Sequence, residues 1–451
     1  MAKQKVMYVC SSCGAEAASW SGKCFGCQAW NTLEEQVMVA PVGRTAQGSK
    51  SAEPALKPQK ISGAIKQDVP RLKTKQSDLD TVLGGGIVRG SVNLLAGQPG
   101  IGKSTLLLQI AHSIGTHSRV LYVSGEESVH QVGLRAKRLQ LGDSDMELIA
   151  SQSTDQIVAT IEQGNYDMVI VDSIQTVACS AVHSAAGSVS QITNSTKLLT
   201  GAAKQANTAL LLVGHVTKEG SIAGPKLLEH IVDVVLQLEG DRYGGYKVLR
   251  AIKNRYGSTE FSAIYEMADV GLRLVKNPSA ALLAERQETD GSIVLATVEG
   301  TRPLLVEVQA LVNKTSFGYP KRAASGIDLN RVTVLIAMLE RRTKLALADK
   351  DVYINIVGGM RLQEPAADLA VCMAIASATK GMKLSTDAVV FGEVGLSGEV
   401  RHVGHIAKRL QEAKKLGFDS AIGPQVSEKI NFEQYSGVRD VRSALNTFLR
   451  N

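Results

Sequence analysis

Short apolar runs alternate with segments of helical pattern through the middle of the chain. Residues 91–97 (SVNLLAG) have the composition of a buried strand, and a glycine-rich turn then leads into a predicted helix from Lys103 (KSTLLLQIAHSI). Further runs typical of strands occur at 119–124, 167–172, 208–214, 233–239 and 246–252. Apolar strands that alternate with helices predict a mostly parallel sheet covered on both faces, so we expect an α/β domain at residues 68–277.

The pattern changes after the Asn277-Pro278 pair, and we expect a second, α+β domain at residues 280–451. It contains strand-like runs at 292–298 and 304–311 and predicted helices near 328–342 and 365–379. The last segment is apolar almost all round, which predicts a helix buried on every side. Ahead of the α/β domain, residues 33–67 are rich in Pro, Gly, Ser, Ala and Lys and read as a flexible linker.

Composition places the chain among globular proteins. Of its 451 residues, 44% are apolar and 21% are charged, which is ordinary for a soluble domain. The sequence contains no run of 18 apolar residues and no secretory signal, so we expect a cytoplasmic protein without a membrane span.

The formal net charge of +7 is concentrated in the linker. Between positions 41 and 76 eight basic residues are opposed only by Glu53 and Asp68. Two interpretations stay open: a solvated, disordered linker, or an arm that binds a polyanion such as nucleic acid.

Four of the six cysteines lie in residues 1–32, as the pairs Cys10–Cys13 and Cys24–Cys27. Two residues between the members of a pair let both thiolates reach one ion, so the two pairs predict a structural zinc site with four sulfur ligands. A segment this small needs such an ion in order to fold, and we expect Trp20 and Trp30 to pack over it. Incidental cysteines or a redox pair are the alternative. The isolated Cys179 and Cys372 are expected to be buried.

The turn after the first strand matches the phosphate-binding pattern GxxxxGKS. Its backbone N–H groups would cradle phosphates, Lys103 would contact the β- and γ-phosphates, and the hydroxyl of Ser104 would reach Mg²⁺. Asp172, at the end of an apolar run, is the expected second magnesium contact, the alternative being a carboxylate that caps the next element. The predicted nucleotide-binding residues are Gly97, Gln98, Pro99, Gly100, Ile101, Gly102, Lys103, Ser104 and Thr105.

The segment Lys253-Asn-Arg255-Tyr-Gly257 points to a family. With LGGGIVRGS (83–91) and YVSGEES (122–128), the chain resembles the RadA/Sms family of bacterial recombination and repair proteins over nearly its whole length. The family pattern is KNRFG, and Tyr256 here replaces the usual Phe. The resemblance implies a zinc finger, a RecA-like ATPase and a Lon-protease-like domain. It further implies hexameric rings that act on single-stranded and branched DNA with RecA, driven by ATP, and ATP, Mg²⁺ and Zn²⁺ as cofactors.

The same resemblance implies roles for three groups in the ATPase. Glu126, the first carboxylate after the strand-ending Gly125, is expected to activate the attacking water, although Glu126 and Glu127 could instead cap a helix. His215 lies where such ATPases place a γ-phosphate sensor, the alternative being a structural histidine. Lys253 and Arg255 are expected to face the nucleotide of a neighbouring subunit, the alternative being a surface turn closed by Gly257.

The Lon-like domain lacks the residues of a protease. Alignment of its motifs with those of Lon puts Ala366 at the serine nucleophile and Ala407 at the lysine base, with Lys408 one residue away. A methyl group can neither attack a carbonyl nor move a proton. We therefore expect no peptidase activity and a scaffold that serves ring assembly and contact with duplex DNA.

Two loops are expected to contact DNA by analogy with RecA, at residues 176–192 and 216–226, the second with Lys218 and Lys226. Neither loop has an aromatic residue, which favours phosphate contacts over base stacking. Two other functions compete with a DNA motor: an ATP-dependent protease, disfavoured by Ala366 and Ala407, and an ATP switch that does not move on DNA.

Overall fold

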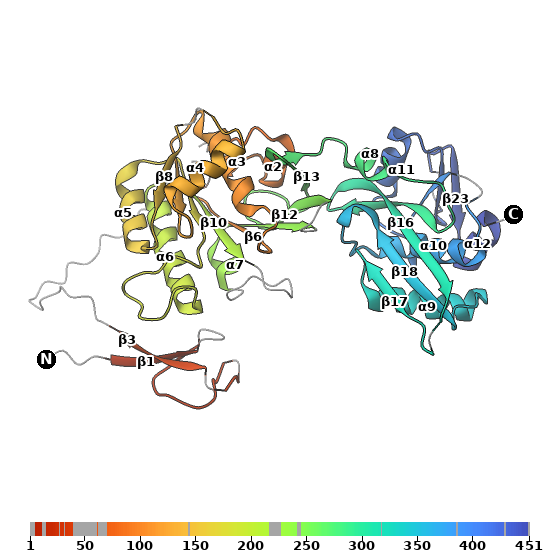
Figure 1. Ribbon diagram of the computed structural model, residues 1–451, viewed down its shortest axis with the longest axis horizontal. Coiled ribbons are helices and arrows are strands. Elements are labelled where there is room, and N and C mark those ends of the chain that lie inside the picture. The colour runs from red at the N-terminus through yellow and green to blue at the C-terminus, as the bar shows by residue number, and fades with distance from the viewer. Residues whose placement is uncertain are drawn as a thin grey trace, which may run out of the picture. The chain divides into compact units, whose positions relative to one another are not determined.

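The computed structural model confirms the α/β and α+β character of the two large regions. It describes residues 5–10, 15–26, 28–30, 32–38, 61, 70–142, 145–215, 227–240, 245–316, 318–384, 387–427 and 430–449. The chain divides into two compact units (Figure 1). One comprises Met1–Leu238, Arg250–Thr259 and Ala268–Leu272, and the other Glu239–Leu249, Glu260–Met267 and Arg273–Asn451.

The N-terminal segment forms a small antiparallel sheet in the order β2-β1-β3, and residues 33–38, which the sequence assigns to the linker, form its third strand because they pair with β1. Its strands are β1 (Lys5–Cys10), β2 (Glu16–Ala17) and β3 (Leu33–Met38), and Cys10 pairs with Leu33 across β1 and β3. Its core is small, with Cys10, Cys24 and Leu33 buried together. A core of this size cannot stabilise a fold by burial alone, which favours a bound metal.

The α/β region is built on a nine-stranded sheet in the order β14-β13-β12-β11-β6-β10-β9-β7-β8. The six strands from β11 to β8 run parallel, as the alternation of strands and helices predicts. Its strands are β6 (Val92–Gly97), β7 (Val120–Ser124), β8 (Glu147–Ala150), β9 (Met168–Asp172), β10 (Ala209–His215), β11 (Val234–Gly240), β12 (Tyr246–Asn254), β13 (Ser262–Ala268) and β14 (Gly271–Leu274).

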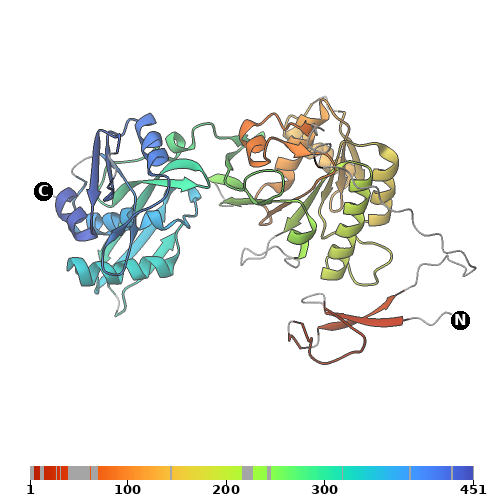
Figure 2. The same ribbon diagram turned by 180° about the vertical axis from the view of Figure 1, so that it is seen from behind.

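Helices lie on both sides of this sheet, as the opposite views in Figures 1 and 2 show. Apolar side chains of α5 and α6 form one buried cluster with β6, β7, β9 and β10. The helices are α2 (Ser77–Val82), α3 (Lys103–Gly115), α4 (Val129–Arg138), α5 (Thr154–Gly164), α6 (Val189–Gln205) and α7 (Leu227–Ile231), and a short ladder joins β4 (Arg71–Leu72) to β5 (Ile87–Val88).

Local chemistry fixes the helix starts near the site. Ser128 forms a capping box with Gln131 at the start of α4. The hydroxyl of Ser153 accepts a hydrogen bond from the backbone N–H of Gln156 at the start of α5. Asn165 ends α5 in the left-handed conformation that asparagine tolerates.

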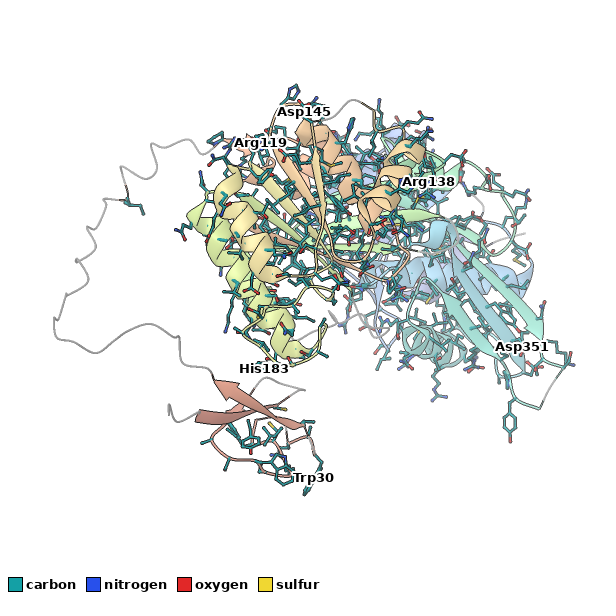
Figure 3. The ribbon with its side chains drawn as sticks, turned by 60° about the vertical axis from the view of Figure 1, so that its left-hand side comes forward. Trp30, Arg119, Arg138, Asp145, His183 and Asp351 are labelled. Atoms are coloured by element: carbon teal, nitrogen blue, oxygen red, sulfur yellow. The ribbon has the colours of Figure 1, made fainter. Side chains whose placement is uncertain are left out.

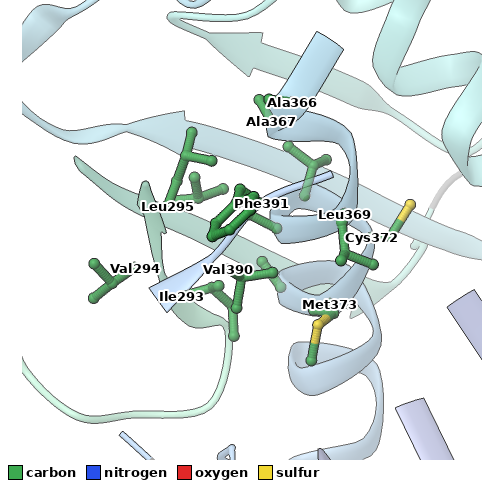
Figure 4. Close-up of a cluster of buried hydrophobic side chains, with 14 of the residues drawn as sticks. Ile293, Val294, Leu295, Ala366, Ala367, Leu369, Cys372, Met373, Val390 and Phe391 are labelled. Atoms are coloured by element: carbon green, nitrogen blue, oxygen red, sulfur yellow. The ribbon is translucent and has the colours of Figure 1, made fainter. Parts of the chain in front are cut away.

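The C-terminal region has a seven-stranded mixed sheet in the order β17-β18-β16-β15-β19-β22-β23. Helix α10 packs against its centre, and all residues from Asp368 to Ser377 are buried, which confirms the prediction of a helix enclosed on every side. Figure 4 shows Leu369 of this helix beside Phe391, whereas the sulfur of Cys372 points to the other side of the helix.

The four runs predicted in this region match β15, β16, α9 and α10 to within three residues, and the other elements had no predicted run. The strands are β15 (Ser292–Glu299), β16 (Arg302–Lys314), β17 (Arg322–Ser325), β18 (Lys350–Ile356), β19 (Ala388–Val390), β20 (Glu393–Val394), β21 (Val400–Arg401), β22 (Ser420–Pro424) and β23 (Gln434–Val438). The helices are α8 (Pro278–Leu283), α9 (Leu329–Thr343), α10 (Asp368–Lys380), α11 (Ile406–Lys415) and α12 (Val441–Phe448), with 3-10 turns η1 (Val357–Gly359) and η2 (Pro365–Ala367).

Cys179 and Cys372 are 2% and 0% exposed, as expected of isolated apolar cysteines. In the part of the chain that the structure describes, no helix is both long and apolar enough to cross a membrane.

Candidate nucleotide-binding site

The turn between β6 and α3 has the backbone of a phosphate-binding loop. Gly100 and Gly102 have φ angles of 79° and 112°, which lie in the region that favours glycine. Gly97 is required for a different reason, because a Cβ atom there would lie 2.7 Å from the carbonyl oxygen of Leu238. Ile101 is buried and anchors the turn, and Ser104 and Thr105 lie in the first turn of α3, where backbone N–H groups point toward a bound anion.

Lys103 is 5% exposed, and its Nζ donates hydrogen bonds to the carbonyl oxygens of Gly97 and Gln98, at 2.9 and 3.1 Å. Burial lowers the pKa of this amine to about 8, and the carboxylates of Asp172 and Glu126 oppose the shift. The positive charge therefore has a high desolvation cost in the protein alone, and a phosphate group would supply a further counter-charge.

Two carboxylates lie at the ends of neighbouring strands beside this loop. Asp172 ends β9, and its Oδ2 accepts a hydrogen bond of 2.6 Å from the hydroxyl of Tyr122 in β7. Burial, with Asp172 nearby, raises the pKa of Tyr122 well above its usual value, so the hydroxyl acts as the donor. Glu126 follows β7, and its Oε1 accepts a hydrogen bond of 2.8 Å from the hydroxyl of Ser173.

Glu126 and Glu127 have different surroundings. Glu127 forms an ion pair with Arg135 of α4, with 2.5 Å between the charged atoms. Glu126 instead acts electrostatically on Lys103 together with Asp172. Of the two carboxylates, Glu126 is the one whose surroundings suit a general base.

The end of β12 and the residues directly after it meet the chain at the start of β11. Lys253 donates hydrogen bonds to the carbonyl oxygens of Glu229 and Val232, at 2.5 and 2.8 Å, where α7 ends. Arg255 forms an ion pair of 2.8 Å with Asp233, whose other oxygen accepts the backbone N–H of Val92. The two cations therefore contact one short turn, at the end of β6 opposite to the phosphate-binding loop.

The rest of this motif packs on the glycine-rich turn after α2. Gly257 and Gly84 lie back to back, since a Cβ on Gly84 would lie 2.8 Å from the Cα of Gly257. Asn254 donates to the carbonyl oxygen of Val82, and Arg71 donates to that of Tyr256, both at 3.1 Å. In the sequence, LGGG only marks the resemblance to a family. In the structure, this turn packs against the KNRYG segment.

The candidate DNA-contact loops are described in part. Residues 216–226, with Lys218 and Lys226, lie outside the described residues, as does the side chain of His215 at the end of β10. The loop before α6 is described, and His183 lies at its outer end (Figure 3).

Gln191, which is 2% exposed, holds that loop. Its side chain accepts the backbone N–H of Cys179 at 3.0 Å and donates to the carbonyl oxygens of Val182 and Ser184 at 2.7 and 3.1 Å. Sequence reasoning missed Gln191, because a polar residue near the start of a helix usually faces solvent.

In the N-terminal ribbon the sulfur atoms of Cys10 and Cys24 are buried in one cluster, and Cys13 and Cys27 lie outside the described residues. The backbone N–H of Gly26 donates to the sulfur of Cys24 at 3.3 Å, a contact that suits a metal-bound thiolate. These features fit a zinc ion. The expectation that the tryptophans pack over the metal is wrong, because Trp20 and Trp30 are 57% and 71% exposed. Their rings flank Gly22 instead. Figure 3 shows Trp30 at the outer edge of the ribbon.

The positions aligned with the Lon dyad have contrasting surroundings. Ala366 is buried in η2, whereas Ala407 is exposed on α11. Lys408 is directed to the carbonyl oxygen of Thr301 at 3.5 Å. The neighbouring Arg409, which is fully buried, forms an ion pair with Glu364. No pattern in the sequence indicates this pair, since an arginine on an amphipathic helix usually faces solvent.

Three protein-family models match the chain: an AAA domain at residues 58–221, a rubredoxin metal binding domain at 8–35 and subunit ChlI of Mg-chelatase at 318–427. The chain is 47% identical to the DNA repair protein RadA of Bacillus subtilis over 456 residues, which cover 100% of both chains. It is 46% identical to the protein of the same name from Listeria monocytogenes over 454 residues, 99% of both chains.

Two solved structures match somewhat less than half of the chain. The crystal structure of the RadB recombinase has a TM-score of 0.38 and 21% identity and covers 46% of this chain and 100% of its own. The structure of a DnaB-like replicative helicase has a TM-score of 0.41 and 14% identity, and the match covers 47% of this chain and 63% of the helicase chain.

Proposed function

Because this chain belongs to the RadA family of DNA repair proteins, we propose that it is an ATP-driven motor that moves on single-stranded and branched DNA in recombinational repair. It is a RecA-like P-loop ATPase with an N-terminal zinc ribbon and a ChlI- and Lon-like C-terminal domain. The proposal adds that the motor is a cytoplasmic, hexameric ring that acts with RecA.

The observation that supports a motor is the position of Lys253 and Arg255. Arg255 forms an ion pair with Asp233, which is hydrogen-bonded to Val92, the first residue of β6. The phosphate-binding loop begins at Gly97, the last residue of the same strand. Five residue steps of about 3.3 Å separate the two ends, so the span is roughly 16 Å. A side chain held at the first end is too far away to contact phosphates at this chain's own loop, so it would contact those on another copy of the chain and tie hydrolysis in one subunit to the next.

The site's residues divide the chemistry of hydrolysis. Lys103 and the backbone of residues 97–105 hold the phosphates, and Ser104 and Asp172 would hold Mg²⁺, which neutralises charge on the phosphates when bound. Glu126 would accept the proton of the attacking water. Lys253 and Arg255 of a neighbouring subunit would stabilise the charge that develops on the γ-phosphate.

The remaining parts of the chain would contact DNA, assemble the ring and bind zinc. The loop at 176–192, together with Lys218 and Lys226, would contact the phosphates of a single strand. His215 would change the conformation of the loop at 216–226 with the state of the nucleotide. The C-terminal domain would serve ring assembly and duplex contact without peptidase activity. One zinc ion, bound by Cys10, Cys13, Cys24 and Cys27, would hold the ribbon together.

The test of this function is the rate of ATP hydrolysis without DNA and with single-stranded, duplex or forked DNA. Lys103→Ala is the negative control. We expect DNA to stimulate the wild-type rate and the variant to have no hydrolysis above background while it keeps its fold. A wild-type rate that no DNA changes would favour an ATP switch that does not move on DNA. Near wild-type hydrolysis by Lys103→Ala would show that the site is elsewhere.

A further inference from the structure

Strands β7 and β9 are hydrogen-bonded neighbours, with Ser124 opposite Asp172 in the parallel register. Each strand provides a hydroxyl to a carboxylate of the other. Tyr122 of β7 donates to Asp172 at 2.6 Å, and Ser173, directly after β9, donates to Glu126 at 2.8 Å. We propose that this reciprocal pair of hydrogen bonds positions the two carboxylates, Tyr122 setting Asp172 for magnesium and Ser173 aiming Glu126 at water. The inference rests on the proposed ATP hydrolysis.

Tyr122 is suited to hold a carboxylate still. Its ring is 1% exposed, and the side chain reaches Asp172 from a fully buried strand. The hydrogen bond takes one lone-pair site of Oδ2 and restrains the rotation of the carboxylate, and sites on both oxygens remain for magnesium or its water. An aspartate without this bond would have to give up rotational freedom each time the ion binds.

Ser173 is itself held in place. It is fully buried, and the hydroxyl of Thr176 donates to its carbonyl oxygen at 2.8 Å. Gly125, which precedes the glutamate, passes so close to this turn that a Cβ atom would lie 2.1 Å from the hydroxyl oxygen of Thr176. The glycine therefore lets Glu126 approach Ser173, which explains why a glycine stands between β7 and the glutamate.

The same sheet offers a matched control. The hydroxyl of Tyr166 donates to the carboxylate of Glu147 at 2.7 Å, so it is also a tyrosine–carboxylate pair. Glu147 begins β8 and Tyr166 lies just before β9, whereas the nucleotide site lies where the parallel strands end. Tyr166→Phe therefore removes a similar bond at the opposite end of the strands.

The test is the affinity of the full-length protein for a non-hydrolysable ATP analogue, measured in EDTA and across a magnesium titration. A hydrogen bond to a charged group changes an equilibrium constant by about tenfold or more. We expect Tyr122→Phe to bind the analogue like wild type in EDTA but to need about tenfold more magnesium for the metal-dependent gain in affinity. Tyr166→Phe should match wild type in both.

The outcomes separate the inference from the proposed function. A magnesium midpoint of Tyr122→Phe equal to that of wild type would overturn the role of Tyr122. An equal loss in EDTA and in magnesium would do the same, because it would show a packing defect. A wild-type protein that gains no affinity from magnesium would instead contradict the proposed ATPase site.

Ser173→Ala tests the other half and does not depend on the folding of the tyrosine variant. We expect its affinity for the analogue and its magnesium midpoint to stay at wild-type values while single-turnover hydrolysis falls about tenfold. Hydrolysis at the wild-type rate would overturn the role of Ser173, and so would a loss of rate that matches a loss of affinity.

Discussion

Lys103 is the residue whose environment has the clearest consequence for nucleotide binding. Its amine is buried at the loop, and burial lowers the pKa from 10.5 to about 8. Below that pH the amine is charged and attracts phosphate, whereas above it the nucleotide-free protein loses the charge. Affinity for ADP measured without magnesium should therefore be constant near pH 7 and fall by up to about tenfold per pH unit above 8. The residual affinity of Lys103→Ala should lack this step. A flat wild-type profile from pH 7 to 9.5 would contradict the account.

Sequence spacing was enough to predict a glycine-rich turn between a strand and a helix at residues 97–105, because nine consecutive positions determine its geometry, including the positive φ angles of Gly100 and Gly102. The partners of the carboxylates were not predictable in that way. Tyr122 and Asp172 are 50 positions apart and meet only because β7 and β9 pair in the observed register. The prediction that Trp20 and Trp30 cover the metal was wrong for a different reason. Large aromatic residues near a small core are usually expected to cover it, but both side chains are exposed.

At the scale of elements, Lys253 and Arg255 both contact the turn between α7 and β11. They could either hold this turn in place or act on the nucleotide of a neighbouring subunit. Arg255 is 52% exposed, and its partner Asp233, which is 3% exposed, keeps the hydrogen bond from the backbone N–H of Val92 when the guanidinium is removed. Lys253→Ala and Arg255→Ala should therefore fold and bind nucleotide like wild type. If the cations act on a neighbour's nucleotide, both variants should lose DNA-stimulated hydrolysis by at least about a hundredfold.

Asp233→Asn is the control for a purely structural role. The amide can still accept the N–H of Val92 but no longer pairs with a charged Arg255. If the motif only fastens the turn, this variant should lose as much coupled hydrolysis as Arg255→Ala. Retained coupling in Asp233→Asn beside lost coupling in Arg255→Ala is the result that we expect.

The loop before α6 is organised by Gln191, and its contribution to DNA binding can be measured separately. Gln191→Leu has a similar volume but removes the bonds to Cys179, Val182 and Ser184, at a cost of about 1–3 kcal/mol. We expect faster hydrogen exchange at residues 179–188 and weaker binding of single-stranded DNA, with nucleotide affinity unchanged. Gln205→Leu, at the exposed end of the same helix, is the control. DNA affinity equal to wild type would remove this loop from the interface.

Periodicity predicted the buried elements well and the peripheral ones poorly. The strands near the centre of the ATPase sheet and the buried helix α10 carry continuous apolar runs, which few other structures accommodate. Edge strand β8 has no buried residue, and β14 has only four residues, so neither leaves a clear pattern in the sequence. Their places depend on pairing with β7 and β13.

At the scale of the whole molecule, a nucleotide site, a basic motif at the far end of the same strands and a metal ribbon belong to one chain. Binding of ATP alone needs only the first of these. The central claim is that the basic motif, with Lys253 and Arg255, couples hydrolysis to movement along DNA through contact between copies of the chain.

The most direct measurement is the movement of a labelled branch point in a synthetic three-strand DNA junction by the full-length protein. We predict that the branch moves with ATP, that it does not move with a non-hydrolysable analogue, and that Arg255→Ala binds the junction without moving it. Movement of the branch at equal rates with ATP and with the analogue, or by Arg255→Ala at the wild-type rate, would contradict the account.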